Sequence, residues 1–281
     1  MDKEIEERVI ERAMEPYPKI SEIVPFSTPV ISFGNPVHAR VLTVGINPSS
    51  LEFLTAGKHK KVLPTGEKRL VDLQVLGIKE ASGLTREAAI RVIQGCYGYF
   101  DSSSKPYMTW FKHLNKNVCN FFGADYREGS AAHVDLVQWA TDPVWGNISN
   151  PATRESLLDG DVEFLKYQID SNAHQVIFMN GKQVFEQLTA HKIVKANIDQ
   201  TIRYQTKLGK SIPINFYKGI TENKTLVLGW SRTFPGHHIS NEALPKVVEQ
   251  LHNHFEKYAS CLLYTSPSPR DRQKSRMPSS A

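Results

Sequence analysis

Four short apolar runs constrain the fold of this chain more than any other feature of its sequence. They are Val41–Val44, His133–Val137, Gln175–Met179 and Thr225–Gly229. Runs as short and as apolar as these are typical of strands that are buried on both faces of a parallel sheet. The longer segments between them have helical character, which predicts an α/β fold in three α/β/α layers. The central sheet is expected to be mainly parallel and to have about four strands.

The expected helices have apolar side chains at the three- and four-residue spacing of a buried helical face. They are Lys3–Met14, Arg86–Gly95, Tyr107–Phe122, Asp161–Asp170, Gly181–His191 and a closing helix at Glu242–Tyr258. Ile212–Tyr217 has the composition of an extra strand. The loop Leu51–Arg69 is long and polar enough to be functional or mobile.

The C-terminal segment Cys261–Ala281 differs in kind from the rest of the chain. It can be back-translated into the adapter sequence of a transposase-based sequencing library, so we expect a translated adapter and not native protein. A natural disordered tail rich in Ser, Pro and Arg is the alternative. Without its four basic residues and one acidic residue, the net charge falls from +5 to +2. The expected organisation is one domain over residues 1–260, in which residues 1–24 form an N-terminal helical extension.

Cysteine usage and hydropathy exclude several classes of protein. Apart from Cys261, only Cys96 and Cys119 are present, too few for the ligands of an iron–sulfur cluster or for a disulfide framework. No zinc site is indicated, and no apolar run has membrane-spanning length. The acidic N-terminus does not fit a signal peptide. We expect a cytoplasmic monomer that needs neither a metal nor another cofactor and does not bind membranes.

The segment Gly45-Ile46-Asn47-Pro48-Ser49 follows the first apolar run directly. Gly45 permits a close approach that a Cβ would prevent, and Pro48 fixes φ in the turn. Asn47 is thereby held at the carboxyl end of a strand, which is where open α/β sheets bind their ligands. The alternative is a strand-to-turn junction without a functional role.

These residues resemble the first signature motif of the uracil-DNA glycosylase superfamily, in the Asn-containing form of its mismatch-specific and single-strand-selective branches. The resemblance covers most of residues 25–255. It implies a three-layer α/β/α fold, DNA as the partner, and hydrolytic release of a flipped base without a cofactor. The N-glycosidic bond breaks through an oxocarbenium-like sugar, so such a site needs a positioned water and donors aimed at the leaving base.

Under this resemblance Asn47 is the residue that positions the attacking water, and Gly45, Ile46, Pro48 and Ser49 contribute to the substrate pocket. An amide can orient a water molecule but cannot remove its proton, so the chain is similar to the slower, amide-type branches. The alternative role for Asn47 is to cap its own turn.

Asp135 is the candidate for reading the flipped base. Period-2 alternation places His133 and Asp135 on one face of the second strand. The family has an Asn near this position, and a carboxylate differs from an amide because it only accepts hydrogen bonds. It would prefer the 4-amino donor of a cytosine-type base to O4 of uracil. An Asp that is solvated or paired with Arg at a strand end is the alternative.

The second family signature is degenerate in this chain. After the last core strand the family usually has His-Pro-Ser, whereas Trp230 stands nearest that histidine here. A later Gly-x-His-aliphatic-Ser element remains, which makes His237 and His238 candidates for stabilising the leaving base. The candidates for DNA contact in this loop are Ser231, Arg232 and Phe234. A histidine pair on an ordinary surface loop is the alternative.

Aromatic and basic side chains complete the predicted site. Phe53, or alternatively Phe100, is the candidate for stacking on the base, although aromatic residues are more often part of a core. Lys60 and Lys61 belong to the densest basic run and are candidates for contacting phosphate, as is Lys182 after the third strand. Such a run is usually a solvated surface.

The sequence therefore predicts a monofunctional DNA N-glycosylase that releases uracil or a modified pyrimidine and leaves an abasic site. Its role would be base-excision repair or defence against modified foreign DNA, such as phage DNA. Two alternatives remain open: a catalytically silent module that binds DNA or a base on the same fold, and a hydrolase of free nucleosides or nucleotides.

Overall fold

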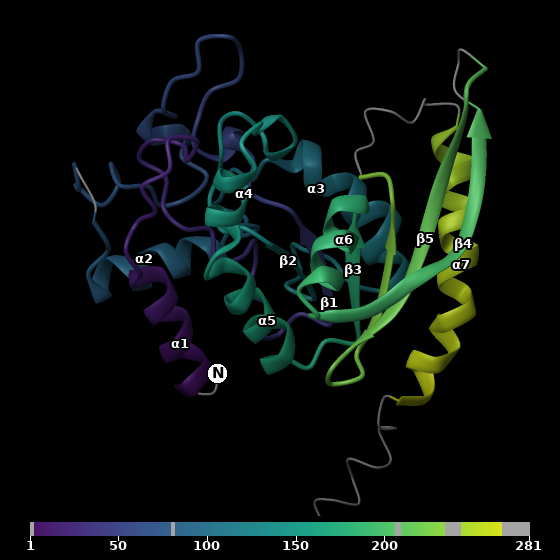
Figure 1. The fold of residues 1–281 in the computed structure, drawn as a ribbon. Helices are drawn as coiled ribbons and strands as arrows, with labels where there is room; N and C mark the ends of the chain where they lie inside the picture. The colour runs from purple at the N-terminus through teal and green to yellow at the C-terminus, as the bar shows by residue number, and fades with distance from the viewer. Residues whose placement is uncertain (1–2, 80–81, 206–208, 234–242, 266–281) are drawn as a thin grey trace, which may run out of the picture.

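The computed structural model describes residues 3–79, 82–205, 209–233 and 243–265. They form one mixed sheet of six strands with helices on both faces (Figure 1). The spatial order of the strands is β2-β1-β3-β6-β5-β4. Their bounds are β1 Val41–Gly45, β2 Ala131–Asp135, β3 Val176–Asn180, β4 Val194–Gln205, β5 Ser211–Thr221 and β6 Leu226–Trp230.

The parallel part of the sheet matches the sequence prediction, whereas the predicted number of strands is wrong. Strands β2, β1, β3 and β6 are parallel neighbours and overlap the four apolar runs, although β2 begins and ends two residues before the predicted run. The antiparallel hairpin β4–β5 adds two strands beside β6. β5 contains the predicted extra strand at Ile212–Tyr217. β4 lies at the edge of the sheet, and polar residues such as Lys195 and Asn197 interrupt its apolar residues. Its sequence therefore does not predict a strand.

The helices form the outer two layers. They are α1 Lys3–Met14, α2 Arg86–Tyr97, α3 Met108–Leu114, α4 Pro151–Leu158, α5 Asp161–Ser171, α6 Lys182–Ala190 and α7 Leu244–Thr265. The main core contains side chains of α1, α2, α3 and α7 together with Phe164 of α5, a second core contains other side chains of α5 and those of α6, and a small third cluster contains Leu157 of α4. The predicted helix 107–122 is helical from Met108 onward but changes its hydrogen bonding after Leu114, where a π-turn and a 3₁₀-turn follow α3.

Side chains on the two faces of β1 pack against the two different helical layers. Val41 joins the core of α1, α2, α3 and α7, whereas Leu42 and Val44 join the core of α5 and α6. Every residue of β1, β2 and β3 is buried, as expected for central parallel strands.

The chain ends pack in different ways. α1 is integrated into the domain, because Val9, Ile10 and Ala13 belong to the main core. α7 runs to Thr265 and so passes the predicted boundary at residue 260. No helix in the described part of the chain is long and apolar enough to span a membrane.

The parallel strands bring four strand ends to one edge of the sheet, which we call the carboxyl edge. β1, β2, β3 and β6 end there at Gly45, Asp135, Asn180 and Trp230. The ladder between the first two continues beyond the strands, since Val137 N donates to Ile46 O at 2.8 Å. The motif loop after β1 therefore lies beside the segment that follows β2.

Candidate functional site

Gly45 makes room for two polar side chains of β2. It pairs with Asp135 in the parallel register, and a Cβ on Gly45 would overlap the Asp135 carboxylate and lie 2.8 Å from Nε2 of His133. Real Cβ atoms are essentially never that close to a neighbour. The motif glycine is therefore required by the packing of β1 against β2.

Asn47 is anchored through its amide nitrogen. Its Nδ2 donates to Oγ1 of Thr141 at 3.0 Å, to the Pro48 carbonyl at 3.2 Å and to the Trp139 carbonyl at 3.4 Å. These contacts fix the amide plane, and they do not use Oδ1, the atom that can accept a hydrogen bond from water. The neighbouring Ser49 caps the short turn at Ser50–Glu52 by accepting from Leu51 N at 3.2 Å. Asn47 thus presents an oriented acceptor at the carboxyl edge.

Asp135 belongs to a buried polar chain that crosses from β2 to β1. Its Oδ1 lies 3.3 Å from Nε2 of His133, and Nδ1 of His133 lies 2.7 Å from Oγ1 of Thr43. Thr43 in turn shares a 2.7 Å hydrogen bond with the Tyr126 hydroxyl. The side chain of Asp135 is 4% exposed. Asp135 is therefore a buried carboxyl group in contact with His133. It is not the solvated aspartate that the sequence left open as an alternative.

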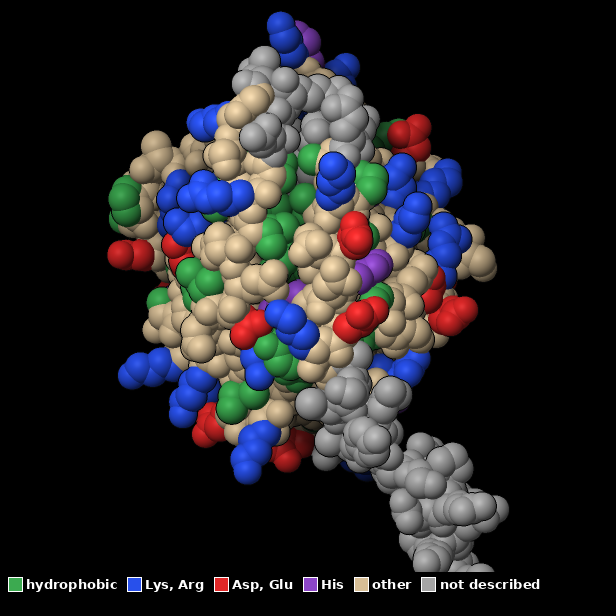
Figure 2. Space-filling view, turned by 90° about the vertical axis from the view of Figure 1, so that its right-hand side faces the viewer, with side chains coloured by type: hydrophobic (Ala, Val, Ile, Leu, Met, Phe, Trp, Pro, Cys, Tyr) green, Lys and Arg blue, Asp and Glu red, His purple; other side chains and the backbone are tan. Residues whose placement is uncertain are grey.

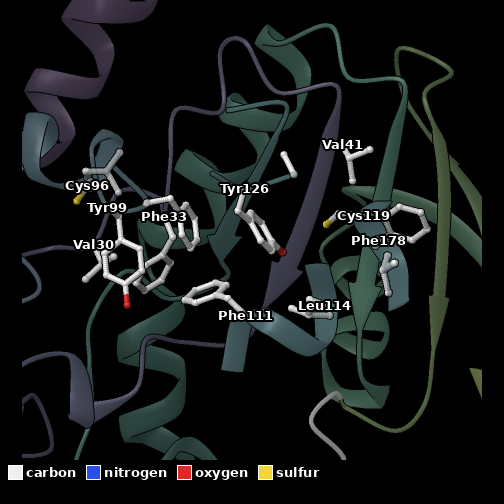
Figure 3. Close-up of a cluster of buried hydrophobic side chains, with 14 of the residues drawn as sticks. Val30, Phe33, Val41, Cys96, Tyr99, Phe111, Leu114, Cys119, Tyr126 and Phe178 are labelled. Carbon is white, nitrogen blue, oxygen red and sulfur yellow. The ribbon is translucent and has the colours of Figure 1, made fainter. Parts of the chain in front are cut away.

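Aromatic rings enclose this polar chain on one side. Phe33 and Phe111 pack against the His133 ring with centroid distances of 5.8 and 5.5 Å. Figure 3 shows Phe33, Phe111 and Tyr126 side by side in the core, with Tyr99 close to Phe33. These rings limit the access of water to His133 and Asp135.

Glu52 is a functional candidate that the sequence analysis did not identify. It is 3% exposed and accepts a 2.6 Å hydrogen bond from the hydroxyl of Tyr99. Burial raises the pKa of Glu52 to about 7, against the hydrogen bond from Tyr99 and the charge of Arg69, while the charge of Asp135 adds to the rise. Glu52 and Asp135 therefore form a buried pair of interacting carboxyl groups, one of which gains or loses a proton near neutral pH.

We expect Glu52→Gln to change how stability depends on pH. The pKa of Glu52 in the folded protein is above its ordinary value of 4.5. Its contribution to the free energy of unfolding is therefore complete below about pH 4.5 and is lost as the pH rises towards 7. The variant should gain stability relative to the wild type over that interval, by up to about 3 kcal/mol. Urea unfolding at several pH values measures the difference.

The exposed Glu67 of the same loop provides the matched control for this measurement. Glu67→Gln should leave the pH profile of stability unchanged. If the free energy of unfolding depended on pH in the same way in Glu52→Gln and in the wild type, the raised pKa of Glu52 would be contradicted.

The structure does not bring the predicted stacking residues to the site. Phe53 and Phe100 are buried in the main core, and Phe100 stacks on Tyr126 with the centroids 4.8 Å apart. Neither ring offers an exposed face to a base, because core packing already covers both. Trp230 is also buried, and its indole nitrogen donates to Oδ1 of Asn180 at 3.1 Å. Its role here is to link the ends of β3 and β6.

Several of the predicted phosphate-binding lysines have partners within the protein. Lys60 donates to Asp142 at 2.7 Å and to Ser50 at 3.3 Å, whereas Lys61 is exposed. Lys182 is exposed and lies 3.2 Å from Glu186. Lys68 and Arg69, from the same run as Lys60, bind Asp72 and the Leu51 carbonyl, respectively. Much of the run therefore stabilises its own loop, which weakens the prediction of a phosphate clamp.

The loop after β6 is described only in its first part. Ser231 Oγ accepts from Asn215 N at 2.9 Å, so this side chain is used to join the loop to β5. Arg232 is half-buried. Phe234, His237 and His238 lie outside the described residues.

The carboxyl edge thus combines Asn47, Asp135 and Glu52 from two neighbouring strand ends. A sequence signal for Glu52 exists, since it stands between the apolar residues Leu51 and Phe53 just after the motif. Its partner Tyr99 is remote in sequence and could not be paired with it in advance. Among the described residues, no group of three or more His, Cys, Asp and Glu side chains is arranged to hold a metal ion.

Comparisons with known proteins add no family to this description. No protein-family model matches the chain, and no curated protein is similar to it in sequence.

Proposed function

We propose that this protein is a DNA glycosylase that hydrolyses the N-glycosidic bond of a flipped uracil or modified pyrimidine. The observation that carries the proposal is the anchored amide of Asn47 at the carboxyl end of β1. Its nitrogen is held by Thr141 and by two carbonyl groups, so its oxygen can orient a water without reorganisation. A preorganised acceptor of this kind suits attack on an oxocarbenium-like sugar.

Glu52 is proposed to supply the proton acceptor that the Asn47 amide lacks. An amide cannot take up the proton of the attacking water, whereas a carboxyl group with a pKa of about 7 exchanges a proton under ordinary conditions. Glu52 is the last residue of the short turn that follows the motif, and its carboxyl group is near enough to Asp135 for their charges to interact. We therefore assign Asn47 to positioning the water and Glu52 to accepting its proton.

Asp135 is proposed to read the base. Its Oδ1 lies near Nε2 of His133, and a carboxylate there can accept a hydrogen bond from the 4-amino group of a cytosine-type base. Because Asp135 is 4% exposed, the base reaches it only after neighbouring groups move aside. Attack on unmodified cytosine would damage the genome of the host, so selectivity would come from a 5-substituent or from the strand context.

Asp135→Asn is expected to move activity from cytosine-type bases towards uracil. The amide can accept from N3–H and donate to O4, which a carboxylate cannot do. One mismatched hydrogen bond costs roughly 1–3 kcal/mol, so the ratio of the two rates should change by about tenfold or more. The measurement is single-turnover base release from duplexes that differ only in the target base. If the wild type prefers uracil and the variant shows the same preference, Asp135 does not read the base.

The proposed glycosylase activity is tested by detecting its two products, the abasic site and the released base. Duplexes carrying uracil or a 5-substituted cytosine are incubated with the protein, abasic sites are detected by alkaline strand cleavage, and released bases are identified by mass spectrometry. Binding without abasic sites would favour the silent binding module. Release of base from free nucleosides but not from DNA would favour the nucleoside hydrolase.

A further inference from the structure

The ring of His133 is enclosed by groups of β1, of β2 and of the aromatic cluster beside them. Its backbone N–H donates to the Phe33 carbonyl at 2.9 Å, and its carbonyl accepts from Phe33 N at 2.7 Å. The ring packs against Phe33 and Phe111, and the side chain is 2% exposed. Both ring nitrogens therefore face protein groups, since Nδ1 lies 2.7 Å from Oγ1 of Thr43 and Nε2 lies 3.3 Å from Oδ1 of Asp135.

The two carboxyl oxygens of Asp135 have different surroundings. Oδ1 is the oxygen near Nε2 of His133, and it is also the atom that a Cβ on Gly45 would overlap. Within the described part of the chain, no hydrogen bond engages Oδ2. Packing against β1 and His133 therefore occupies one oxygen and leaves the other as the atom that can bind a ligand.

The hydrogen bonds of His133 decide whether Asp135 accepts or donates. A neutral imidazole donates through one nitrogen and accepts through the other. If Nε2 donates, Oδ1 of Asp135 accepts, and Nδ1 then accepts the hydroxyl proton of Thr43. If Nδ1 donates to Thr43 instead, the bare Nε2 takes a proton from Asp135, which is then a carboxylic acid. The direction of the hydrogen bond between Thr43 and His133 therefore fixes the hydrogen-bonding character of Asp135.

Two observations favour donation from Thr43 to His133. Oγ1 of Thr43 lies closer to Nδ1, at 2.7 Å, than to the Ala132 carbonyl, at 3.3 Å. The Tyr126 hydroxyl, 2.7 Å from Oγ1, can donate to Thr43, so that each group donates to the next and the chain ends on a carboxylate. The opposite direction would end at Cys119, the other hydrogen-bonding neighbour of Tyr126, and a thiol sulfur is a weak acceptor. The direction that ends on the charged, stronger acceptor is the more stable one.

We propose that Thr43 and His133 are positioning residues that keep Asp135 a hydrogen-bond acceptor and present only its Oδ2 to the flipped base. This inference rests on the proposed function, because it takes Asp135 as the residue that reads the base. A single acceptor oxygen is satisfied by the 4-amino group of a cytosine-type base, whereas O4 of uracil has no proton to donate to it. The hydroxyl of Thr43, which does not touch the base, thereby sets the base preference.

The test is equilibrium binding of two fluorescein-labelled DNA duplexes that differ only in the target nucleotide, 2′-fluorodeoxycytidine or 2′-fluorodeoxyuridine. The electron-withdrawing fluorine destabilises an oxocarbenium-like sugar, so binding can be measured whether or not the protein releases a natural base. Figure 2 shows lysine and arginine side chains in several groups on one face of the molecule. Phosphate contacts by such groups carry no information about the base, so the ratio of the two affinities isolates the reading of the base.

Thr43→Val keeps the shape of the side chain but removes its hydroxyl. The preference for the cytosine duplex over the uracil duplex should therefore fall by roughly fivefold or more, which is the scale of one misdirected hydrogen bond. Thr43→Ser retains a hydroxyl and should keep the wild-type preference. If the role of Thr43 were only structural, Thr43→Val would weaken the binding of both duplexes equally and leave the ratio unchanged.

Thr221→Val is the matched control. The side chain of Thr221 is also buried, and its hydroxyl accepts from Thr225 N at 3.1 Å. Its neighbour Ile220 pairs with Leu226, the first residue of β6, so this threonine lies at the edge of the sheet opposite the carboxyl edge. The control should keep the wild-type preference, and urea unfolding compares its stability with that of Thr43→Val.

The possible outcomes separate this inference from the proposed function. If Thr43→Val loses the cytosine preference and Thr43→Ser keeps it, the inference is supported, even when the wild type forms no abasic sites and the glycosylase proposal fails. If the wild type releases base but Thr43→Val keeps the wild-type preference, the inference is wrong and the glycosylase proposal stands. Equal loss in Thr43→Val and Thr43→Ser, or a wild type that does not distinguish the two duplexes, would also overturn the inference.

Discussion

Asn47→Ala should slow base release by roughly 10²-fold or more while leaving the affinity for DNA nearly unchanged. The substitution removes the anchored acceptor that orients the attacking water, and it removes no cationic group that could bind phosphate. Loss of one preorganised group that acts in the transition state typically costs 10²-fold or more, so we expect a decrease of roughly that size in the single-turnover rate. The measurement is abasic-site formation with excess protein, together with duplex affinity.

Thr141→Val provides a graded control for this prediction. It removes the 3.0 Å partner of the Asn47 amide but keeps Asn47 itself, so the rate should fall less than in Asn47→Ala. If Asn47→Ala releases base at the wild-type rate, Asn47 is only a turn residue and the proposed function loses its main support.

Arg12→Ala should produce the largest loss of stability. Arg12 is 3% exposed, forms an ion pair with Asp161, and donates to Oε1 of Gln138 at 3.2 Å. Burial already raises the pKa of Asp161 to about 6, against the opposing charge of Arg12. Removing Arg12 leaves a buried carboxylate without its cation, which typically costs about 3–5 kcal/mol. Urea unfolding at pH 7 gives the free energy of unfolding.

Arg8→Ala is the matched control on the same helix. The side chain of Arg8 is 35% exposed, and it lies 3.6 and 3.7 Å from two glutamates, so its removal should cost at most about 1 kcal/mol. The penalty of Arg12→Ala should also shrink as the pH falls towards about 6, because Asp161, whose pKa is already about 6 beside Arg12 and rises further without it, is then protonated and no longer an unpaired charge. A penalty that is small at pH 7, or independent of pH, would show that the ion pair does not stabilise the connection between α1 and α5.

Local sequence was sufficient to predict those elements whose structure depends on residues that are neighbours along the chain. The four parallel strands could be placed because each is a short, mainly apolar run, and α1 because its apolar residues recur at helical spacing. The same reasoning failed for β4, where an exposed edge removes the apolar pattern. It also failed for Phe53 and Phe100, since an aromatic side chain near a motif looks the same in sequence whether it faces a ligand or the core.

The sequence by itself determined the parallel core and the position of Asn47 at the end of β1, because strand burial and a Gly-Pro turn are properties of adjacent residues. Tertiary structure alone decided that Asp135 lies against Gly45, that Glu52 is buried beneath Tyr99, and that Lys60 is neutralised by Asp142. Each of these depends on groups that are distant in sequence. Burial and charge proximity set the pKa of a carboxyl group and the availability of a lysine, and both arise only when the chain is folded.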